Sequence, residues 1–322
     1  MHHHNTIVLA GAGVFGTAMA ERLSWNTKNT VILWSIEADV VLDINRNHRN
    51  SKYFPTHFLN TSIRATGDKA IFSSADCILL VIPSKAIVSF TEEIKAMTKE
   101  ECMVINLAKG MSDDGAFITE QIPFRRTASM KGPTFAIEVL HGLPSSFTFG
   151  GTREDYLDFK QFILPDTGLY LDYTQDIRSV ELMSILKNMY AIAIGLVSGR
   201  FNSPNVDFLI YTKAVNEMRR FLSLFECETE TIFRYCGIGD LGLTSLNDLS
   251  RNRTLGLLMG KGFSMEGGQK STTVLEGSRT VKLMGEMTRD KEVSEQFPLV
   301  QALYRLMYEG ATLNEYMQAA FC

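Results

Sequence analysis

Two lysines of this 322-residue sequence stand where a lysine could move a proton or hold an anion. Lys187 lies in the middle of residues 182–197, which are apolar on nearly every face of a helix, a pattern typical of a buried helix. Burial of an ammonium is costly unless it is paired, and it lowers the lysine pKa toward the range useful for proton transfer. Lys187 is therefore a candidate general acid or base. The alternative is a lysine whose stem crosses apolar surface and whose charge reaches solvent.

A buried lysine needs a carboxylate, and the glycine-rich residues 237–244 offer Asp240 in an otherwise apolar run that ends at Thr244. Asp240 could hold Lys187 in place, or it could be an ordinary cap or turn residue. Lys109 follows an apolar strand predicted over residues 103–107, so it stands at a carboxyl end, where open α/β sheets bind their ligands. Lys109 could equally be an exposed loop lysine with no ligand.

A candidate anion site follows at the start of a helix predicted to run to Met259. Ser250 is a suitable capping residue, and Arg251, Asn252 and Arg253 come directly after it. A capping hydroxyl, free helix amides and arginines together suit a phosphate group. The alternative, a basic surface turn, does not explain why both arginines crowd one helix start.

The glycines Gly11, Gly13 and Gly16 form a GxGxxG motif between a strand predicted over residues 6–10 and a helix predicted over residues 17–25. In a dinucleotide-binding fold the first glycine allows a tight turn, the second lets the backbone approach a pyrophosphate, and the third lets helix pack on strand. This context favours a dinucleotide site over a glycine-rich turn without a ligand.

The residues after the second predicted strand, over 30–35, bear on the choice between NAD and NADP. An acid there would bind a ribose hydroxyl, whereas an arginine would bind a 2′-phosphate. Glu37 is the candidate acid, and no arginine occurs before Arg46. NAD is weakly favoured, although Glu37 could equally be a solvated acid at a helix start. A small-residue turn at 132–136 could bring further backbone close to a cofactor.

The elements that must position these residues change in type along the chain. Strands predicted over residues 6–10, 30–35, 77–82 and 103–107 alternate with helices, which is typical of parallel βαβ units. Three further strands near 128–130, 146–149 and 169–173 could lie at one edge of the sheet. Helical periodicity dominates after Asp176. The sequence thus predicts a dinucleotide-binding α/β domain over residues 1–175 and an all-α domain over residues 176–322.

Composition narrows the functional class. Hydrophobic residues at 45% and charged residues at 21% are globular averages, and a net charge of −4 supplies no broad basic surface for nucleic acid. The five cysteines show no metal-ligand spacing, and an odd number argues against a disulfide framework, so no metal and a reducing, cytoplasmic compartment are expected. The longest uncharged stretch, residues 5–20, is too short to span a membrane.

Together, these segments resemble one family along nearly the whole chain, the NAD(P)-dependent sn-glycerol-3-phosphate dehydrogenases of the bacterial type. The resemblance is carried by GAGVFGTAMA (11–20), SKYFP (51–55), LAKGM (107–111), GPTFAIEV (132–139), KNMYAIAIG (187–195), GDLGLTSLNDLSRNRTLG (239–256) and VLEGSRT (274–280). It implies a Rossmann-type domain followed by a helical domain like the C-terminal domain of 6-phosphogluconate dehydrogenase. It also implies interconversion of dihydroxyacetone phosphate and sn-glycerol 3-phosphate, a reaction of glycerophospholipid metabolism.

The resemblance implies a role for each matching residue. Lys187 would exchange the proton with the carbonyl oxygen, Lys109 would touch substrate and cofactor, and Asp240 would orient Lys187 with Thr244 beside it. Substrate contacts would come from Lys109, Gly132, Thr134, Lys187, Asp240, Ser250, Arg251 and Asn252. Cofactor contacts would come from Gly11, Gly13, Val14, Phe15, Gly16, Lys109, Ala136, Arg251, Val274 and Glu276.

Two other functions remain open from the sequence. One is a reductase of another small keto acid on the same two-domain plan, which would lack the arginine-rich phosphate site. The other is a catalytically silent dinucleotide-binding protein, which would have no need for a proton-transfer lysine. The apolar helices of the second half also suggest a homodimer.

Overall fold

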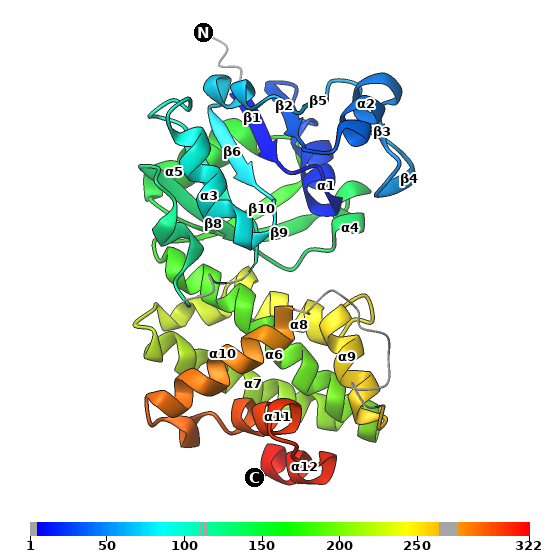
Figure 1. The fold of residues 1–322 in the computed structure, drawn as a ribbon, viewed down its shortest axis with the longest axis vertical. Coiled ribbons are helices and arrows are strands. Elements are labelled where there is room, and N and C mark those ends of the chain that lie inside the picture. Colours follow the sequence, from blue (N-terminus) through cyan, green and yellow to red (C-terminus); the bar gives the residue numbers. More distant parts are fainter. Residues whose placement is uncertain (1–4, 110, 112–114, 264–275) are drawn as a thin grey trace. The chain divides into compact units, whose positions relative to one another are not determined.

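The computed structural model describes residues 5–109, 111, 115–263 and 276–322, and the chain divides into two compact units (Figure 1). The first unit is Met1–Val180 and the second is Glu181–Cys322. The sequence predicts a boundary after residue 175, and the long helix α6 (Ile177–Phe201) begins just beyond it. The two units therefore divide within the first turn of that helix.

The first unit is built on an eight-stranded sheet with strand order β10-β9-β8-β7-β6-β1-β2-β5. Its strands are β1 (Asn5–Ala10), β2 (Asn29–Trp34), β5 (Arg64–Thr66), β6 (Cys77–Leu80), β7 (Met103–Asn106), β8 (Arg126–Lys131), β9 (Ser145–Gly150) and β10 (Leu169–Thr174). Helices and turns join them: α1 (Val14–Leu23), α2 (Ala38–Asn47), η1 (Lys69–Ser74), α3 (Ser84–Lys95), η2 (Ile118–Gln121), α4 (Ala136–Leu140), α5 (Arg153–Asp158) and η3 (Phe159–Ile163). A small two-stranded sheet pairs β3 (Arg49–Asn50) with β4 (Phe54–Phe58).

The central strands are short apolar runs buried on both faces, as a parallel sheet between helical layers requires. The strands β5, β2, β1, β6, β7 and β8 run parallel to one another. The last three predicted strands lie together at one edge, as expected, but β9 pairs antiparallel to β8, so the sheet is mixed. The Rossmann-type fold class is confirmed.

The chain order of the strands reverses at one point of the sheet. From β1 the chain adds β2 and β5 on one side, and then crosses to add β6, β7 and β8 on the other. Ligands of such sheets bind outside the carboxyl ends at the point where the order reverses, which here lies between β1 and β6. The glycine loop after β1 therefore lies at this point.

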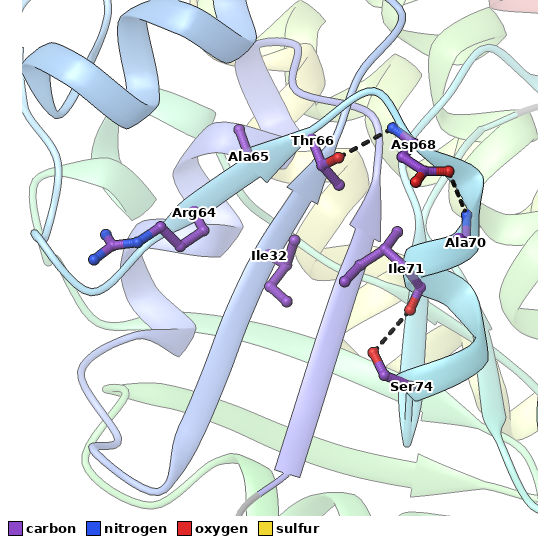
Figure 2. A pocket seen from close by; sticks show the side chains of 8 residues that line it. All are labelled: Ile32, Arg64, Ala65, Thr66, Asp68, Ala70, Ile71 and Ser74. Atoms are coloured by element: carbon purple, nitrogen blue, oxygen red, sulfur yellow. Dashed lines mark hydrogen bonds between the residues drawn. The ribbon is translucent and has the colours of Figure 1, made fainter.

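A cavity of about 410 Å³ lies near the β5 edge of the sheet, over β2 and β5 (Figure 2). Ile32 on β2 and Ile71 on η1 face it, with Arg64 and Asp68 among its other lining residues. It contains none of the predicted site residues.

The free edge of β5 is closed by Asn45 of α2, whose side-chain amide accepts from the Ala65 N–H at 2.9 Å and donates to the Ala65 carbonyl at 2.8 Å. This pairing blocks edge-to-edge strand addition.

The second unit is helical throughout its described residues, as the sequence predicts. After α6 come α7 (Pro204–Leu224), η4 (Thr229–Phe233), η5 (Tyr235–Gly239), α8 (Asp240–Ser245), α9 (Arg251–Gly260), α10 (Glu276–Asp290), η6 (Ser294–Gln296), α11 (Pro298–Tyr308) and α12 (Leu313–Phe321). Helix α6 is long and apolar enough to cross a membrane by length and composition, but its apolar window is wholly buried. It is the core helix of this unit.

Four glycines let α6 and α9 pack backbone against backbone. A Cβ added at Gly256 would lie 2.1 Å from the Ile192 carbonyl oxygen, and one at Gly260 would lie 2.1 Å from the Leu196 carbonyl oxygen. From the other side, a Cβ at Gly195 would lie 2.3 Å from the Arg253 carbonyl oxygen, and one at Gly199 would lie 2.4 Å from the Leu257 carbonyl oxygen. Because real Cβ atoms cannot approach this closely, these positions require glycine. The start of α9 is thereby fixed against α6.

A buried carboxylate joins three helices of the second unit. Glu217 on α7 accepts hydrogen bonds from the Leu299 amide at 2.6 Å, the Val300 amide at 3.2 Å and the Tyr190 hydroxyl at 2.9 Å. The two amides belong to the first turn of α11, so Glu217 caps that helix from outside. Burial nevertheless raises the pKa of Glu217 to about 7.

This raised pKa predicts a pH dependence of stability. Because the folded protein holds the Glu217 proton more tightly than the unfolded chain, its stabilising contribution is complete below pH 4.5 and is lost as the pH rises through 7. The unfolding free energy of the wild type minus that of Glu217→Gln, measured by urea unfolding, should therefore fall by about 3 kcal/mol as the pH rises across this window. The exposed Glu230→Gln is the control, and a flat difference for Glu217→Gln would contradict the assignment.

Candidate active site

The glycine loop joins β1 to α1 and leaves its amides open. Gly11 has a φ of +119°, and a Cβ there would lie 2.8 Å from the Val81 carbonyl oxygen. A Cβ at Gly16 would lie 2.0 Å from the Gly11 carbonyl oxygen, so the helix can begin at Val14, earlier than the sequence predicts. Gly13 is the N-cap residue and has no atom within 4 Å of an added Cβ. The first and third glycines thus serve packing, and the second faces open space.

This loop fits the pyrophosphate of a dinucleotide. The first turn of α1 carries no acidic residue, so the unpaired amides at its start and the positive end of the helix dipole are not neutralised. Val14 is exposed, whereas Phe15 is partly buried and packs on the core, with its ring centroid 6.4 Å from that of Phe147. Of the predicted cofactor contacts in this loop, Phe15 also has a clear packing role.

Glu37 lies after β2 and is the N-cap residue of α2. Its carboxylate does not cap the helix amides, but pairs with the Lys52 ammonium and accepts a hydrogen bond from the Tyr53 hydroxyl at 3.0 Å. The neighbouring ammonium lowers the pKa of Glu37. The acid that the sequence proposes for the ribose therefore belongs to a cluster of three polar side chains.

The remaining predicted residues of the first unit follow β7 and β8, whose carboxyl ends lie at the same edge as that of β1. Lys109 is exposed and comes three residues after the end of β7. Gly132 is buried, and a Cβ there would lie 2.1 Å from the Ser146 carbonyl oxygen, so packing against β9 already explains this glycine. Thr134 and Ala136, the first residue of α4, are partly buried.

In the second unit, Lys187 and Asp240 form a buried ion pair. The Lys187 side chain is 2% exposed and that of Asp240 is 3% exposed. The Thr244 hydroxyl lies 3.4 Å from the second oxygen of the Asp240 carboxylate. The snorkelling alternative for Lys187 is therefore wrong, because its ammonium is paired inside the fold.

The local sequence before Asp240 fixes the position of its carboxylate. Gly237 has non-helical backbone angles, and a Cβ there would lie 2.1 Å from the Ile232 carbonyl oxygen. The Tyr211 hydroxyl donates to the Ile238 carbonyl at 2.7 Å and ties this turn to α7. Asp240 then begins α8, so Thr244 falls one turn later on the same face.

The start of α9 is arranged as the sequence predicts for Ser250, but not for both arginines. Ser250 is the N-cap residue, and its hydroxyl accepts from the Arg253 amide at 3.3 Å. The Arg253 guanidinium turns into the fold and donates to the Ser245 carbonyl at 2.5 Å and to the Ser198 hydroxyl at 3.2 Å. The expectation that both arginines serve an anion is therefore corrected, because Arg253 holds α9 to α8 and α6. Arg251 is exposed.

The start of α10 meets the same region of α6 and α9. The Asn188 side chain donates to the Glu276 carboxylate at 3.3 Å. A Cβ at Gly277 would lie 2.6 Å from Asn252 Oδ1 and 2.7 Å from the Asn188 carbonyl oxygen. Asn252 Oδ1 is buried, and it has no hydrogen-bond partner among the described residues. The predicted cofactor contact Val274 lies outside the described residues.

The second unit therefore gathers its predicted residues on three helix starts around α6, with Lys187 and Asn188 adjacent on that helix. Comparison with known families shows to which family the chain belongs. Residues 6–156 match the family model for the N-terminus of NAD-dependent glycerol-3-phosphate dehydrogenases, and residues 176–318 match the model for the C-terminus. The chain belongs to the NAD-dependent glycerol-3-phosphate dehydrogenase family.

Individual relatives agree over the whole chain. A glycerol-3-phosphate dehydrogenase [NAD(P)+] of Methanothermobacter thermautotrophicus is 32% identical over 97% of this chain and 96% of its own. The solved glycerol-3-phosphate dehydrogenase of Coxiella burnetii is 26% identical, with a TM-score of 0.84 over 100% of this chain and 98% of its own. The yeast enzyme, at 22% identity and a TM-score of 0.86 over 98% and 99% of the two chains, shares the fold.

Sequence reasoning left out several side chains of this dehydrogenase that the structure places at these sites. Lys52 and Tyr53 lie in the SKYFP segment that carries the resemblance, and Asn188 follows Lys187 directly, so each had a signal. Lys131 had none, because it ends a strand where a buried apolar residue is expected. Lys131 is 4% exposed, and its ammonium donates to the Asn106 carbonyl at 2.7 Å. No group of three metal-ligating side chains occurs in the part of the chain that the structure describes.

Proposed function

We propose that this protein is an oxidoreductase that interconverts dihydroxyacetone phosphate and sn-glycerol 3-phosphate with NAD or NADP. The observation that carries this proposal is the buried Lys187–Asp240 pair in a chain of the glycerol-3-phosphate dehydrogenase family. A buried ammonium is expensive to keep, and a protein that only binds a dinucleotide has no use for one. Its presence favours catalysis over a silent binding role.

Lys187 would act as the general acid in ketone reduction, donating a proton from Nζ to the C2 carbonyl oxygen, and as the base in the reverse reaction. Asp240 would position Lys187 and keep it charged until the transfer, with Thr244 restraining the carboxylate. Lys109 would add positive charge where the alkoxide develops. These residues need no metal ion.

The substrate phosphate would be held at the start of α9 by Ser250, Arg251 and Asn252. A helix start offers free amides and a favourable dipole, and Arg251 is exposed for a charge-assisted hydrogen bond. Held at its phosphate, the substrate is fixed at a point remote from the reacting carbon, which lowers the entropic part of the barrier.

The cofactor would lie on the first unit, with its pyrophosphate on the open amides after Gly13. When bound, the nicotinamide supplies or accepts the hydride at C2. Gly11 and Gly16 shape the loop, Val14 and Phe15 start the helix, and Lys109 and Ala136 lie after strands whose carboxyl ends share that edge. The resemblance also makes Arg251 and Glu276 proposed cofactor contacts.

We further propose that the chain acts in the cytoplasm as a homodimer, in the glycerophospholipid metabolism that consumes sn-glycerol 3-phosphate. The five free cysteines support a reducing compartment. Sedimentation at micromolar concentration tests the oligomeric state, and a purely monomeric profile would reject the dimer.

The assay that tests the proposed activity follows NADH and NADPH oxidation with dihydroxyacetone phosphate. Non-phosphorylated keto acids, including ketopantoate, are the comparison substrates. Turnover only with the phosphorylated ketone supports the proposal. A preference for a keto acid would instead indicate a reductase of another small keto acid. Cofactor binding without turnover of any substrate would favour a silent binding protein.

Arg251→Ala should raise KM for dihydroxyacetone phosphate by about 10- to 100-fold, because a charge-assisted hydrogen bond to phosphate contributes about 1.5–3 kcal/mol. Lys261→Ala is the matched control, since it removes an exposed cation from the other end of α9. Steady-state kinetics with each substrate varied in turn would check this. An equal rise in KM for the cofactor would contradict a phosphate role.

A further inference from the structure

Three buried polar residues lie at the carboxyl ends of β7 and β8. Asn106 ends β7, Ser129 stands opposite it in the register of β8, and Lys131 ends β8. All three are buried, including the lysine. Because burial of an ammonium is costly unless hydrogen bonds offset it, the contacts of Lys131 should explain why it is there.

Lys131 and Ser129 both donate to the main-chain carbonyl of Asn106. Nζ of Lys131 lies 2.7 Å from this oxygen, and Oγ of Ser129 lies 3.3 Å from it. A hydrogen bond from an ammonium is stronger than one from a neutral donor, and burial shields this one from water. The end of β7 is therefore fastened to the end of β8 by a charge-assisted bond.

The Asn106 side chain carries this attachment into the turn that leads to Lys109. Its Oδ1 accepts from the Ala108 amide at 2.9 Å. Ala108 is partly buried, whereas Lys109 directly after it is exposed. The backbone that leads to Lys109 is thus tied to Asn106, and through Asn106 to Lys131.

Lys131 also precedes the second turn that the proposed reaction uses, residues 132–134. It pairs with Thr148 in the antiparallel register of β8 and β9. Gly132 then packs so closely on β9 that an added Cβ would lie 2.1 Å from the Ser146 carbonyl oxygen. The turn at 132–134 is therefore fixed to β9, and Lys131 stands between it and the turn that leads to Lys109.

We propose that Lys131 is a positioning residue, which holds the Lys109 turn in place against the turn at 132–134 through the Asn106 carbonyl. In the proposed reaction Lys109 adds positive charge where the alkoxide develops, and such stabilisation requires a group that is fixed before the reaction. A shift of about 1 Å in a group of this kind can lower the rate by about 10²-fold. The role of Lys131 rests on the proposed function, because it acts through Lys109.

Hydrogen exchange at the Ala108 amide tests the attachment itself, in protein without substrate or cofactor. Lys131→Met keeps the apolar stem but removes the donor, so this amide should exchange at least about tenfold faster than in the wild type. Lys131→Gln keeps an N–H donor without the charge and should restore most of the protection. Unchanged exchange in Lys131→Met would overturn the proposal.

Lys213→Met is the matched control for the exchange measurement. Lys213 of α7 also donates its ammonium to a main-chain carbonyl, that of Ala320 at 2.9 Å, but within the second unit. Its replacement removes the same kind of bond and should leave exchange at Ala108 and kcat unchanged.

A double-mutant cycle with Lys109 tests the positioning role. In the wild type, Lys131→Met should lower kcat for dihydroxyacetone phosphate reduction by about 10²-fold. Lys131→Gln should recover at least about tenfold of that loss, since a neutral hydrogen bond keeps the attachment. In the Lys109→Met background, Lys131→Met should lower kcat less than about threefold, because the group that it positions is gone.

Two results of this cycle would overturn the proposal. Equal losses of kcat in both backgrounds would mean that Lys131 acts independently of Lys109. A Lys131→Gln variant as slow as Lys131→Met would mean that the charge of Lys131, and not its hold on the Asn106 carbonyl, affects the reaction.

Ser129→Ala provides a milder variant in case Lys131→Met does not fold. It removes only the longer bond to the Asn106 carbonyl, and urea unfolding would confirm that it remains folded. It should lower kcat by about threefold or more in the wild type, the effect of one neutral hydrogen bond, and leave the Lys109→Met variant unchanged. A wild-type kcat in Ser129→Ala would then reject the proposal.

Failure of the positioning role and failure of the proposed substrate give different results. Coupled effects of Lys131 and Lys109 on reduction of a keto acid, without turnover of dihydroxyacetone phosphate, would support the role of Lys131 and reject the substrate. Turnover of dihydroxyacetone phosphate with independent effects would reject the role of Lys131 and support the substrate. A chain that reduces no ketone would reject both.

Discussion

Replacing Lys187 by methionine is expected to lower kcat for dihydroxyacetone phosphate reduction by about 10³-fold, within the range for loss of a general acid. The side chain keeps its apolar stem but loses the only proton that the buried pair can deliver to the substrate oxygen. NADH affinity, measured by calorimetry, should stay within about threefold, since the glycine loop and Glu37 belong to the other unit.

The Lys187→Met variant needs a control for stability, because it leaves the buried Asp240 carboxylate without its ion-pair partner. Removing one partner of a buried ion pair costs about 3–5 kcal/mol, so Lys187→Met alone could fail to fold. The double variant Lys187→Met with Asp240→Asn removes both charges and should regain most of that loss without regaining activity. Lys187→Arg keeps the charge of the pair, but a guanidinium does not give up its proton near neutral pH, so this variant should also be inactive. Activity within tenfold of the wild type in the double variant would reject Lys187 as the proton donor.

Most of the fold could be predicted because its signals are local. The buried strands are continuous apolar runs, and the glycine loop has fixed spacing, so their types follow from the sequence. The strands β3, β4 and β5 are missed because they are two to five residues long and carry polar residues or a proline. The early start of α1 is missed because Gly16 lowers helix propensity, and only the approach of Gly11 explains why glycine is needed there.

Local sequence signals predict the structural role of some site residues but not of others. An isolated lysine in an apolar helix demands a carboxylate wherever that lies in the sequence, so chemistry alone leads from Lys187 to Asp240. The two arginines after Ser250 carry identical local signals, yet Arg253 turns inward to the Ser245 carbonyl while Arg251 is exposed. That difference depends on how α9 packs against α6 and α8, which no motif encodes.

This packing can be tested at Gly256, where alanine is expected to lower kcat/KM for dihydroxyacetone phosphate by about 10²-fold. The added Cβ would lie 2.1 Å from the Ile192 carbonyl oxygen, so α9 must move away from α6. Arg251 and Asn252 lie at the start of α9 and would move with it, and a misplacement of about 1 Å can cost a factor of this size. Steady-state kinetics and urea unfolding on the same samples would measure both consequences.

Two matched glycines separate positioning from stability. Gly242→Ala, in α8, would place its Cβ 3.5 Å from the Tyr211 hydroxyl, an ordinary contact, and should be stable and active. Gly260→Ala makes the same clash as Gly256→Ala, 2.1 Å from the Leu196 carbonyl oxygen, but at the far end of α9. If the glycines position the phosphate site, both clashing variants lose similar stability, whereas KM for dihydroxyacetone phosphate rises more for Gly256→Ala. Equal KM values would mean that these glycines only stabilise the unit.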